Sequence, residues 1–62
     1  MEKLIITRRE AAEALSISVD TLDGLRANGH IKGFRIGARV YYTREEMDAF
    51  VKKAVKKGAI YA

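Results

Sequence analysis

Two arginines flank a glycine near the middle of this 62-residue sequence. Arg35 and Arg39 stand on either side of Gly37 with no acidic residue nearby. A guanidinium presents a planar fork of N–H donors that matches phosphate oxygens, and arginines also enter narrow minor grooves. The pair is therefore suited to contacting a nucleic-acid backbone. An ordinary solvated hairpin is the alternative interpretation.

Basic and acidic residues are segregated along the chain. Lys and Arg number 12 against 8 Asp and Glu, which gives a formal net charge of +4. Residues 24–44 contain basic side chains and no acid, whereas residues 10–23 contain acids and no base. This pattern predicts one surface suited to a polyanion and another that is not. The two sets are Arg26, Lys32, Arg35, Arg39 and Arg44, and Glu10, Glu13, Asp20 and Asp23.

The remaining charged residues carry weaker signals. A lysine cluster supplies the excess positive charge, and a solvated helix face is its favoured interpretation over a binding patch. His30 stands alone beside Gly29, which favours a loop residue with no metal or catalytic role. The cluster consists of Lys52, Lys53, Lys56 and Lys57.

Length and composition exclude several classes of protein. A chain of this size forms one domain with a marginal core, and the absence of Cys excludes disulfides and zinc-finger sites. We expect no cofactor, no metal and no enzymatic activity, because a catalytic pocket needs more room. The apolar run at residues 4–6 is shorter than a signal peptide or membrane span requires, so we expect a cytoplasmic protein.

Capping patterns predict two consecutive helices. Thr7 followed by Glu10 forms a capping box, so a helix should start there and present Ala11, Ala12 and Leu15 on one side. Residues 16–18 should end this helix, and Ser18 should cap a second one with Leu22 and Leu25 facing inward. Asn28 and Gly29 should end the second helix. Two helices joined by so short a turn form a helix-turn-helix, whose second helix enters the DNA major groove.

A hairpin is expected next. The β-prone runs 34–36 and 40–42 flank a turn containing Gly37. A two-residue loop would divide the apolar residues between the two faces, so a three-residue loop, residues 37–39, is preferred. That loop would place Arg39 at the tip, send Arg35 and Tyr41 outward, and keep four side chains on the core face. These four are Phe34, Ile36, Val40 and Tyr42.

A third helix should follow the hairpin. Thr43 and Glu46 form a second capping box, and apolar residues then recur at helical spacing as far as Val55. Met47 and Phe50 should join Phe34 and Tyr42 in the core. The helix should run to about Lys57 and end at Gly58. The domain would then cover residues 1–58, and the tail, residues 59–62, is expected to be frayed.

In this order, the elements resemble the excisionase and AlpA-like branch of the MerR-type winged-helix proteins. The resemblance runs from about Ile6 to Val51, and the joint spacing of several short motifs carries it. These are Thr7 with Glu10-Ala11-Ala12, Ile17-Ser18, Thr21-Leu22 with Leu25, Asn28-Gly29, Arg35-Ile36-Gly37 with Arg39, and Arg44-Glu45 with Met47 and Phe50.

The resemblance implies a mainly α fold with a small β-hairpin, a winged helix-turn-helix, and a function in duplex DNA binding. Family members place the second helix in the major groove and the wing on the backbone. Many are excisionases of phages or integrative elements, which bend DNA to direct an integrase toward excision, and others regulate promoters. The residues expected to contact DNA are Ser18, Val19, Asp20, Thr21, Asp23, Gly24, Arg26, Arg35, Gly37, Arg39, Tyr41 and Arg44.

The outer face of the second helix departs from the family, whose members carry basic or aromatic residues there. Asp20 and Asp23 are repelled by phosphate and read a base only by accepting from cytosine N4. Gly24 also costs a helix about 1 kcal/mol against Ala. Three interpretations stay open: the wing carries most of the affinity, the acids reject wrong sequences, or this face binds a protein. A protein-interaction module, such as an antirepressor or adaptor, is the competing hypothesis.

We expect a monomer in solution, since no heptad pattern extends beyond the domain. Copies of the protein would then line up side by side on DNA, and an integrase is the expected protein partner.

Overall fold

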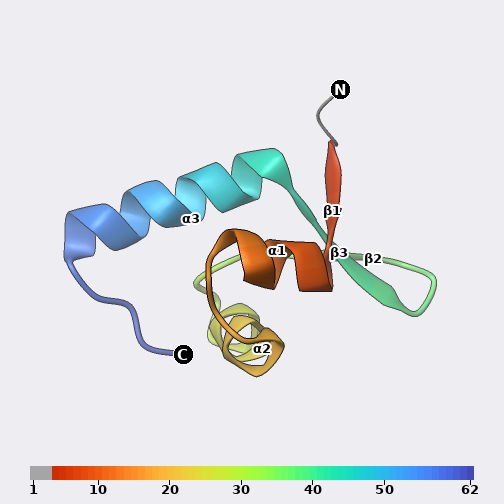
Figure 1. Cartoon of the computed structure of the whole chain (residues 1–62), viewed down its shortest axis with the longest axis horizontal. Helices are drawn as coiled ribbons and strands as arrows, with labels where there is room; N and C mark the ends of the chain where they lie inside the picture. The colour runs from red at the N-terminus through yellow and green to blue at the C-terminus, as the bar shows by residue number, and fades with distance from the viewer. Residues whose placement is uncertain (1–3) are drawn as a thin grey trace.

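A computed structural model describes residues 4–62. Two short helices pack together beside a small sheet, and a longer third helix extends away from the hairpin (Figure 1). The elements follow one another as β1 (Ile5–Thr7), α1 (Arg8–Ala14), α2 (Val19–Ala27), β2 (Phe34–Ile36), β3 (Arg39–Thr43) and α3 (Arg44–Lys57).

The caps of α1 and α2 confirm the predicted helix-turn-helix. The Thr7 hydroxyl accepts from the Glu10 amide at 3.1 Å, and the Glu10 carboxylate accepts from the Thr7 amide at 3.0 Å. Ser16 reverses the chain after α1 with a φ of 58°, and the Ser18 hydroxyl then caps α2. Asn28 ends α2 and Gly29 follows in the left-handed region. Each helix boundary is thus encoded by side chains within one turn of it.

The core lies where α1 and α2 meet the inner face of the sheet. Alanines on α1 face leucines on α2, and the small side chains allow close approach of the two helices. Tyr42 on β3 is 0% exposed and is the largest of these buried side chains. The buried set is Ala11, Ala12, Leu22, Leu25, Ile31, Tyr42 and Met47, with Leu15 and Phe50 packed against it.

The hairpin is part of a three-stranded antiparallel sheet in the order β1-β3-β2. Strand β1 was not predicted, because a run of three apolar residues does not show the alternation of apolar and polar residues that indicates a strand. It pairs Ile6 with Tyr42 and Thr7 with Tyr41. Since β1 runs directly into α1, the sheet fixes where the helix-turn-helix begins.

The predicted three-residue wing loop is wrong. Ile36 pairs with Arg39, so the loop consists of Gly37 and Ala38, and Arg39 is the first residue of β3 rather than the tip. Gly37 has a φ of 63°, and a glycine with positive φ at the first loop position is the pattern of a type II′ turn. This turn matches the twist of the strands, and its geometry outweighs the grouping of apolar residues on one face.

The two-residue loop divides the apolar side chains of the wing. Val40 and Tyr42 face the core as predicted, but Phe34 and Ile36 are 37% and 55% exposed. Phe34 pairs across the sheet with Tyr41, their ring centroids 6.2 Å apart. Because side chains alternate along a strand, Arg35 lies on the face of its partner Val40 and not on the face of Tyr41, although its side chain is exposed as predicted.

The third helix begins and ends where predicted, although its cap differs. The Thr43 hydroxyl accepts from the Glu46 amide, and Gly58 closes the helix with a left-handed φ. The Glu46 carboxylate, however, accepts from the backbone N–H of Lys32 at 3.4 Å. It therefore ties α3 to the loop after α2, in place of completing the predicted capping box.

The tail after α3 has no regular secondary structure, and it turns back toward α2 (Figure 1). Ile60 packs against the core. Whether this tail frays in solution stays a prediction. These elements together form a winged helix-turn-helix: α1 and α2 make the helix pair, β2 and β3 make the wing, and α3 closes the fold.

The Tyr42 hydroxyl is buried, and no hydrogen bond of good geometry reaches it from the residues that the structure describes. Burial raises the pKa of this phenol, and the Arg26 guanidinium opposes the shift in part through its positive charge and a weak side-chain hydrogen bond. The core therefore depends mainly on the ring of Tyr42, and its hydroxyl has only this weak interaction with Arg26.

We expect Tyr42→Phe to change the free energy of unfolding by less than about 1 kcal/mol, because no hydrogen bond of good geometry is lost. Tyr42→Ala should lower the free energy of unfolding by about 3–5 kcal/mol, because it leaves a cavity at the centre of the core. Urea unfolding of both variants measures these differences. A large loss of stability in Tyr42→Phe would show that the hydroxyl has a partner.

Candidate nucleic-acid interface

Four arginines gather around one hollow between the helix pair and the wing. The hollow has a volume of about 570 Å³. Its four arginines and single aspartate give it a net charge of +3, so it suits an anion. We refer to it as the arginine hollow; its lining residues are Thr7, Arg8, Arg9, Asp23, Arg26, Ala38, Arg39, Val40 and Tyr41.

The end of β1 creates this hollow. Pairing between β1 and β3 stops at Thr7 and Tyr41, so β1 does not accompany β3 as far as Val40 and Arg39. Thr7 then caps α1, which places Arg8 and Arg9 in the first turn of that helix. One wall is therefore the start of α1, the second is the uncovered edge of β3, and α2 supplies the third.

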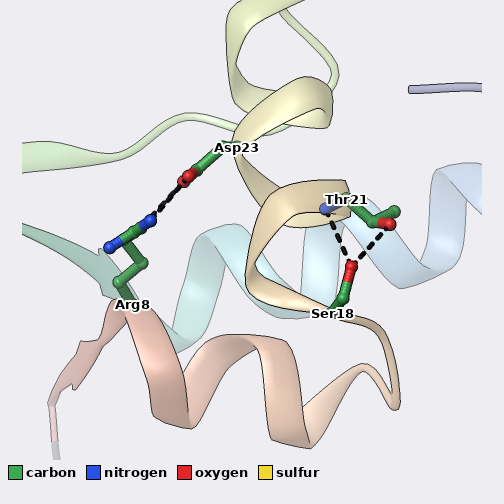
Figure 2. A network of polar contacts seen from close by, with 4 residues as sticks. All are labelled: Arg8, Ser18, Thr21 and Asp23. Atoms are coloured by element: carbon green, nitrogen blue, oxygen red, sulfur yellow. Dashed lines mark hydrogen bonds and ion pairs between the residues drawn. The ribbon is translucent and has the colours of Figure 1, made fainter.

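Arg8 and Asp23 form a bidentate ion pair across the helix-turn-helix. Figure 2 shows the Arg8 side chain reaching from the start of α1 to Asp23 on α2. Nε donates to Oδ1 at 2.9 Å and Nη2 donates to Oδ2 at 2.7 Å. These hydrogen bonds hold the pKa of the Asp23 carboxyl below its ordinary value and raise the pKa of Arg8.

The ion pair changes the interpretation of the acidic second helix. None of the three open interpretations paired Asp23 with a cation of the same chain, yet its carboxylate is engaged by Arg8. A guanidinium has five N–H donors, and this pair uses two of them. Arg8 can therefore hold Asp23 and still contact a phosphate.

Seven of the twelve predicted site residues fall into three groups. Asp23, Arg26, Arg39 and Tyr41 line the arginine hollow together. Arg35 and Gly37 lie on the wing but do not line it. Arg44 lines a separate hollow with Leu4 and Asp48, so the structure does not bring it to the others.

On α2, the predicted residues have structural contacts of their own. The Ser18 hydroxyl accepts from the Thr21 amide at 3.1 Å and donates to the Thr21 hydroxyl at 2.9 Å (Figure 2). Val19 packs against the core, and Asp20 is exposed. Gly24 is half-buried and lies against Ala62. Ser18, Asp20 and Thr21 are all exposed, but the hydroxyls of Ser18 and Thr21 are joined to each other, whereas the Asp20 carboxylate acts on Arg8 through its charge alone.

Sequence reasoning missed Arg8 and Arg9. A helix dipole disfavours a cation in the first turn, so a cation there, such as Arg44 at the start of α3, indicates a bound anion. Two adjacent arginines directly after the cap at Thr7 carry the same signal more strongly. Their role depends on the strand before them, which the sequence did not reveal.

Two further classes of site are not formed by the described part of the chain. No group of three or more His, Asp or Glu side chains in residues 4–62 is placed to hold a metal ion. No helix within those residues is long and apolar enough to cross a bilayer.

The Arg8 pair makes a prediction about pH. Because the folded-state pKa of Asp23 is lowered, the pair stabilises the fold above the ordinary carboxyl value of 3.8, and this stabilisation is lost as the pH falls through the lower folded value. Asp23→Asn should therefore be less stable than the unsubstituted protein near neutral pH, and the difference should shrink in acid. Thermal unfolding at a series of pH values measures it.

Asp20→Asn is the matched control, since it makes the same change at an exposed position of the same helix. If the Asp23→Asn difference were the same at every pH, the ion pair would not be the source of the stability.

Comparison with known proteins agrees with this architecture. Residues 5–60 match a family described as a helix-turn-helix domain, a range that includes every helix and strand of the fold. No curated protein and no solved structure gives a significant match. Since the match covers most of the chain, the protein belongs to this helix-turn-helix domain family.

Proposed function

We propose that the protein binds duplex DNA with α2 in the major groove and the arginine hollow over an adjacent phosphate strand. The observation that carries the proposal is the gathering of four arginines between α2 and the wing. Phosphate contacts position a protein on DNA and supply most of the non-specific affinity. Arg8, Arg9, Arg26 and Arg39 would make these contacts, with Asp23 orienting Arg8. Catalysis forms no part of this proposal.

Sequence reading would rest on the outer face of α2. Leu22 and Leu25 are buried, so the opposite side of the helix faces outward. That side carries Asp20, which can accept from cytosine N4, and Ala27, which can contact a thymine methyl group. A face of small side chains permits close approach to base edges, but it offers few bidentate contacts. Specificity would therefore depend partly on DNA shape.

Within this function, an excisionase of a phage or integrative element is the favoured role, on the basis of the resemblance to excisionases and AlpA-like proteins. The protein would act in the bacterial cytoplasm at the nucleoid, as monomers that assemble side by side on DNA and cooperate with an integrase. A small transcriptional regulator would use the same module. Footprinting on DNA flanking the gene, followed by a bending assay and an integrase-dependent excision assay, separates the two roles.

A protein-interaction module is less well supported than the sequence alone indicated. Its best argument was the acidic face of α2, and Asp23 is now accounted for by Arg8. A module that binds only proteins would show no salt-dependent affinity for duplex DNA.

Salt dependence tests the DNA-binding proposal directly. With about four to six phosphates neutralised, the logarithm of affinity against the logarithm of salt concentration should have a slope of about −4 to −5. Fluorescence anisotropy with a labelled duplex measures this slope, and a slope near zero would refute DNA binding. Arg39→Ala should weaken binding by about 1–3 kcal/mol and reduce the steepness of the slope by about 1.

Arg35→Ala is the matched control for this test. It removes the same charge from the same wing, but Arg35 does not line the arginine hollow. We expect it to have a smaller effect than Arg39→Ala. Equal losses would indicate that the wing acts through its total charge and that the hollow is not the binding site.

A further inference from the structure

Gly24 has no local reason to be a glycine. It lies inside α2 with ordinary helical geometry, where glycine costs about 1 kcal/mol against alanine. The tail supplies a reason: a Cβ at this position would lie 3.0 Å from the Cβ of Ala62. The absence of a side chain at Gly24 therefore allows the tail to lie directly against α2.

The tail is held on both sides of Tyr61. Ile60 and Ala62 line an apolar hollow of about 310 Å³, formed mainly by residues of α2 and α3. Ile60 also packs against the core. Tyr61 lies between these two anchored residues and is 82% exposed. The fold thus holds an aromatic side chain in solvent beside the helix that we place in the DNA groove.

The tail lies on the flank of α2 that is opposite the wing. Asp23 and Arg26 line the arginine hollow on the wing side, whereas Thr21 lines the apolar hollow with the tail. Residues on a helix are about 100° apart, so Gly24 stands next to Thr21 along the tail-side flank. A helix in a major groove about 12 Å wide has a phosphate strand on each flank. The wing and the tail would therefore face different strands.

We propose that residues 59–62 form a second DNA-contacting arm, in which Tyr61 contacts the phosphate strand opposite the one held by the wing. This inference rests on the DNA-binding function proposed above. The tyrosine hydroxyl can donate to a phosphate oxygen, and the ring can pack on the sugar. Tyr61 and its neighbours in the tail carry no charged side chain, so replacing Tyr61 removes no positive charge and should leave the salt dependence of binding unchanged.

The first test is Tyr61→Ala in the full chain, titrated against the footprinted duplex. We expect affinity to fall about threefold to tenfold, with the salt slope and the melting temperature unchanged. Leu4→Ala is the matched control, because Leu4 is also 82% exposed and directly precedes β1, a strand whose start lies on the far side of the molecule from α2 (Figure 1). The control should bind like the unsubstituted protein.

The second test uses tryptophan as a probe, since the sequence contains none. Emission from Tyr61→Trp should change when duplex DNA is added, and emission from Leu4→Trp should not. A Tyr61→Ala variant with unchanged affinity, or a silent Tyr61→Trp probe on a bound duplex, would overturn the arm.

Tighter binding by Tyr61→Ala would also overturn it, because the tail would then obstruct the groove. These results differ from failure of the proposed function, in which the unsubstituted protein itself shows no salt-dependent affinity for duplex DNA.

Discussion

The packing of Tyr42 against the helix pair is the contact on which the rest of the structure depends. Its ring comes from the central strand and fills the space beneath α1 and α2, so it couples the sheet to the helix-turn-helix. A domain of this size buries few side chains, and the loss of one large one removes much of its stability. Because the wing is an extension of the same strand, this contact also sets the wing beside α2. The arginine hollow is a consequence of that placement.

The hollow shows how a small basic protein can gather positive charge without an equal cost in stability. Four guanidinium groups around one space repel one another in the absence of DNA. Asp23 offsets part of this repulsion and fixes the position of Arg8 through two short hydrogen bonds. An acid on the second helix of a helix-turn-helix is therefore compatible with DNA binding, because it pairs with a neighbouring arginine of the same chain. The exposed Asp20 makes a smaller contribution of the same kind, because its negative charge also favours the ionised form of Arg8 and raises the pKa of that guanidinium.

The sequence was sufficient for features decided within one helical turn. Thr7, Ser18 and Gly58 mark their helix ends through their own side chain or backbone, and Leu22 and Leu25 reveal the buried face by spacing alone. It was insufficient where two distant segments had to be paired. The strand β1 exists because β3 is beside it, and its end is what brings Arg8 and Arg9 to the wing. The predicted wing register was wrong for a different reason: the tight turn that Gly37 permits outweighs the pattern of apolar residues along the two strands.

Gly24 has both a local effect on its helix and a contact with a distant segment of the chain. Considered locally, it is a defect in α2, and composition gives no hint of what compensates for it. Considered in the fold, it is the site where a segment 38 residues later along the chain reaches the helix surface. A chain with so small a core gains from every contact that covers apolar surface, and Ile60 covers the gap that α3 leaves beside α2. The same contact between the tail and α2 holds Tyr61 in solvent. One contact therefore both closes the core and shapes the outer surface. The outer face of α2 carries mostly small side chains, and it lies between the wing on one flank and the tail on the other.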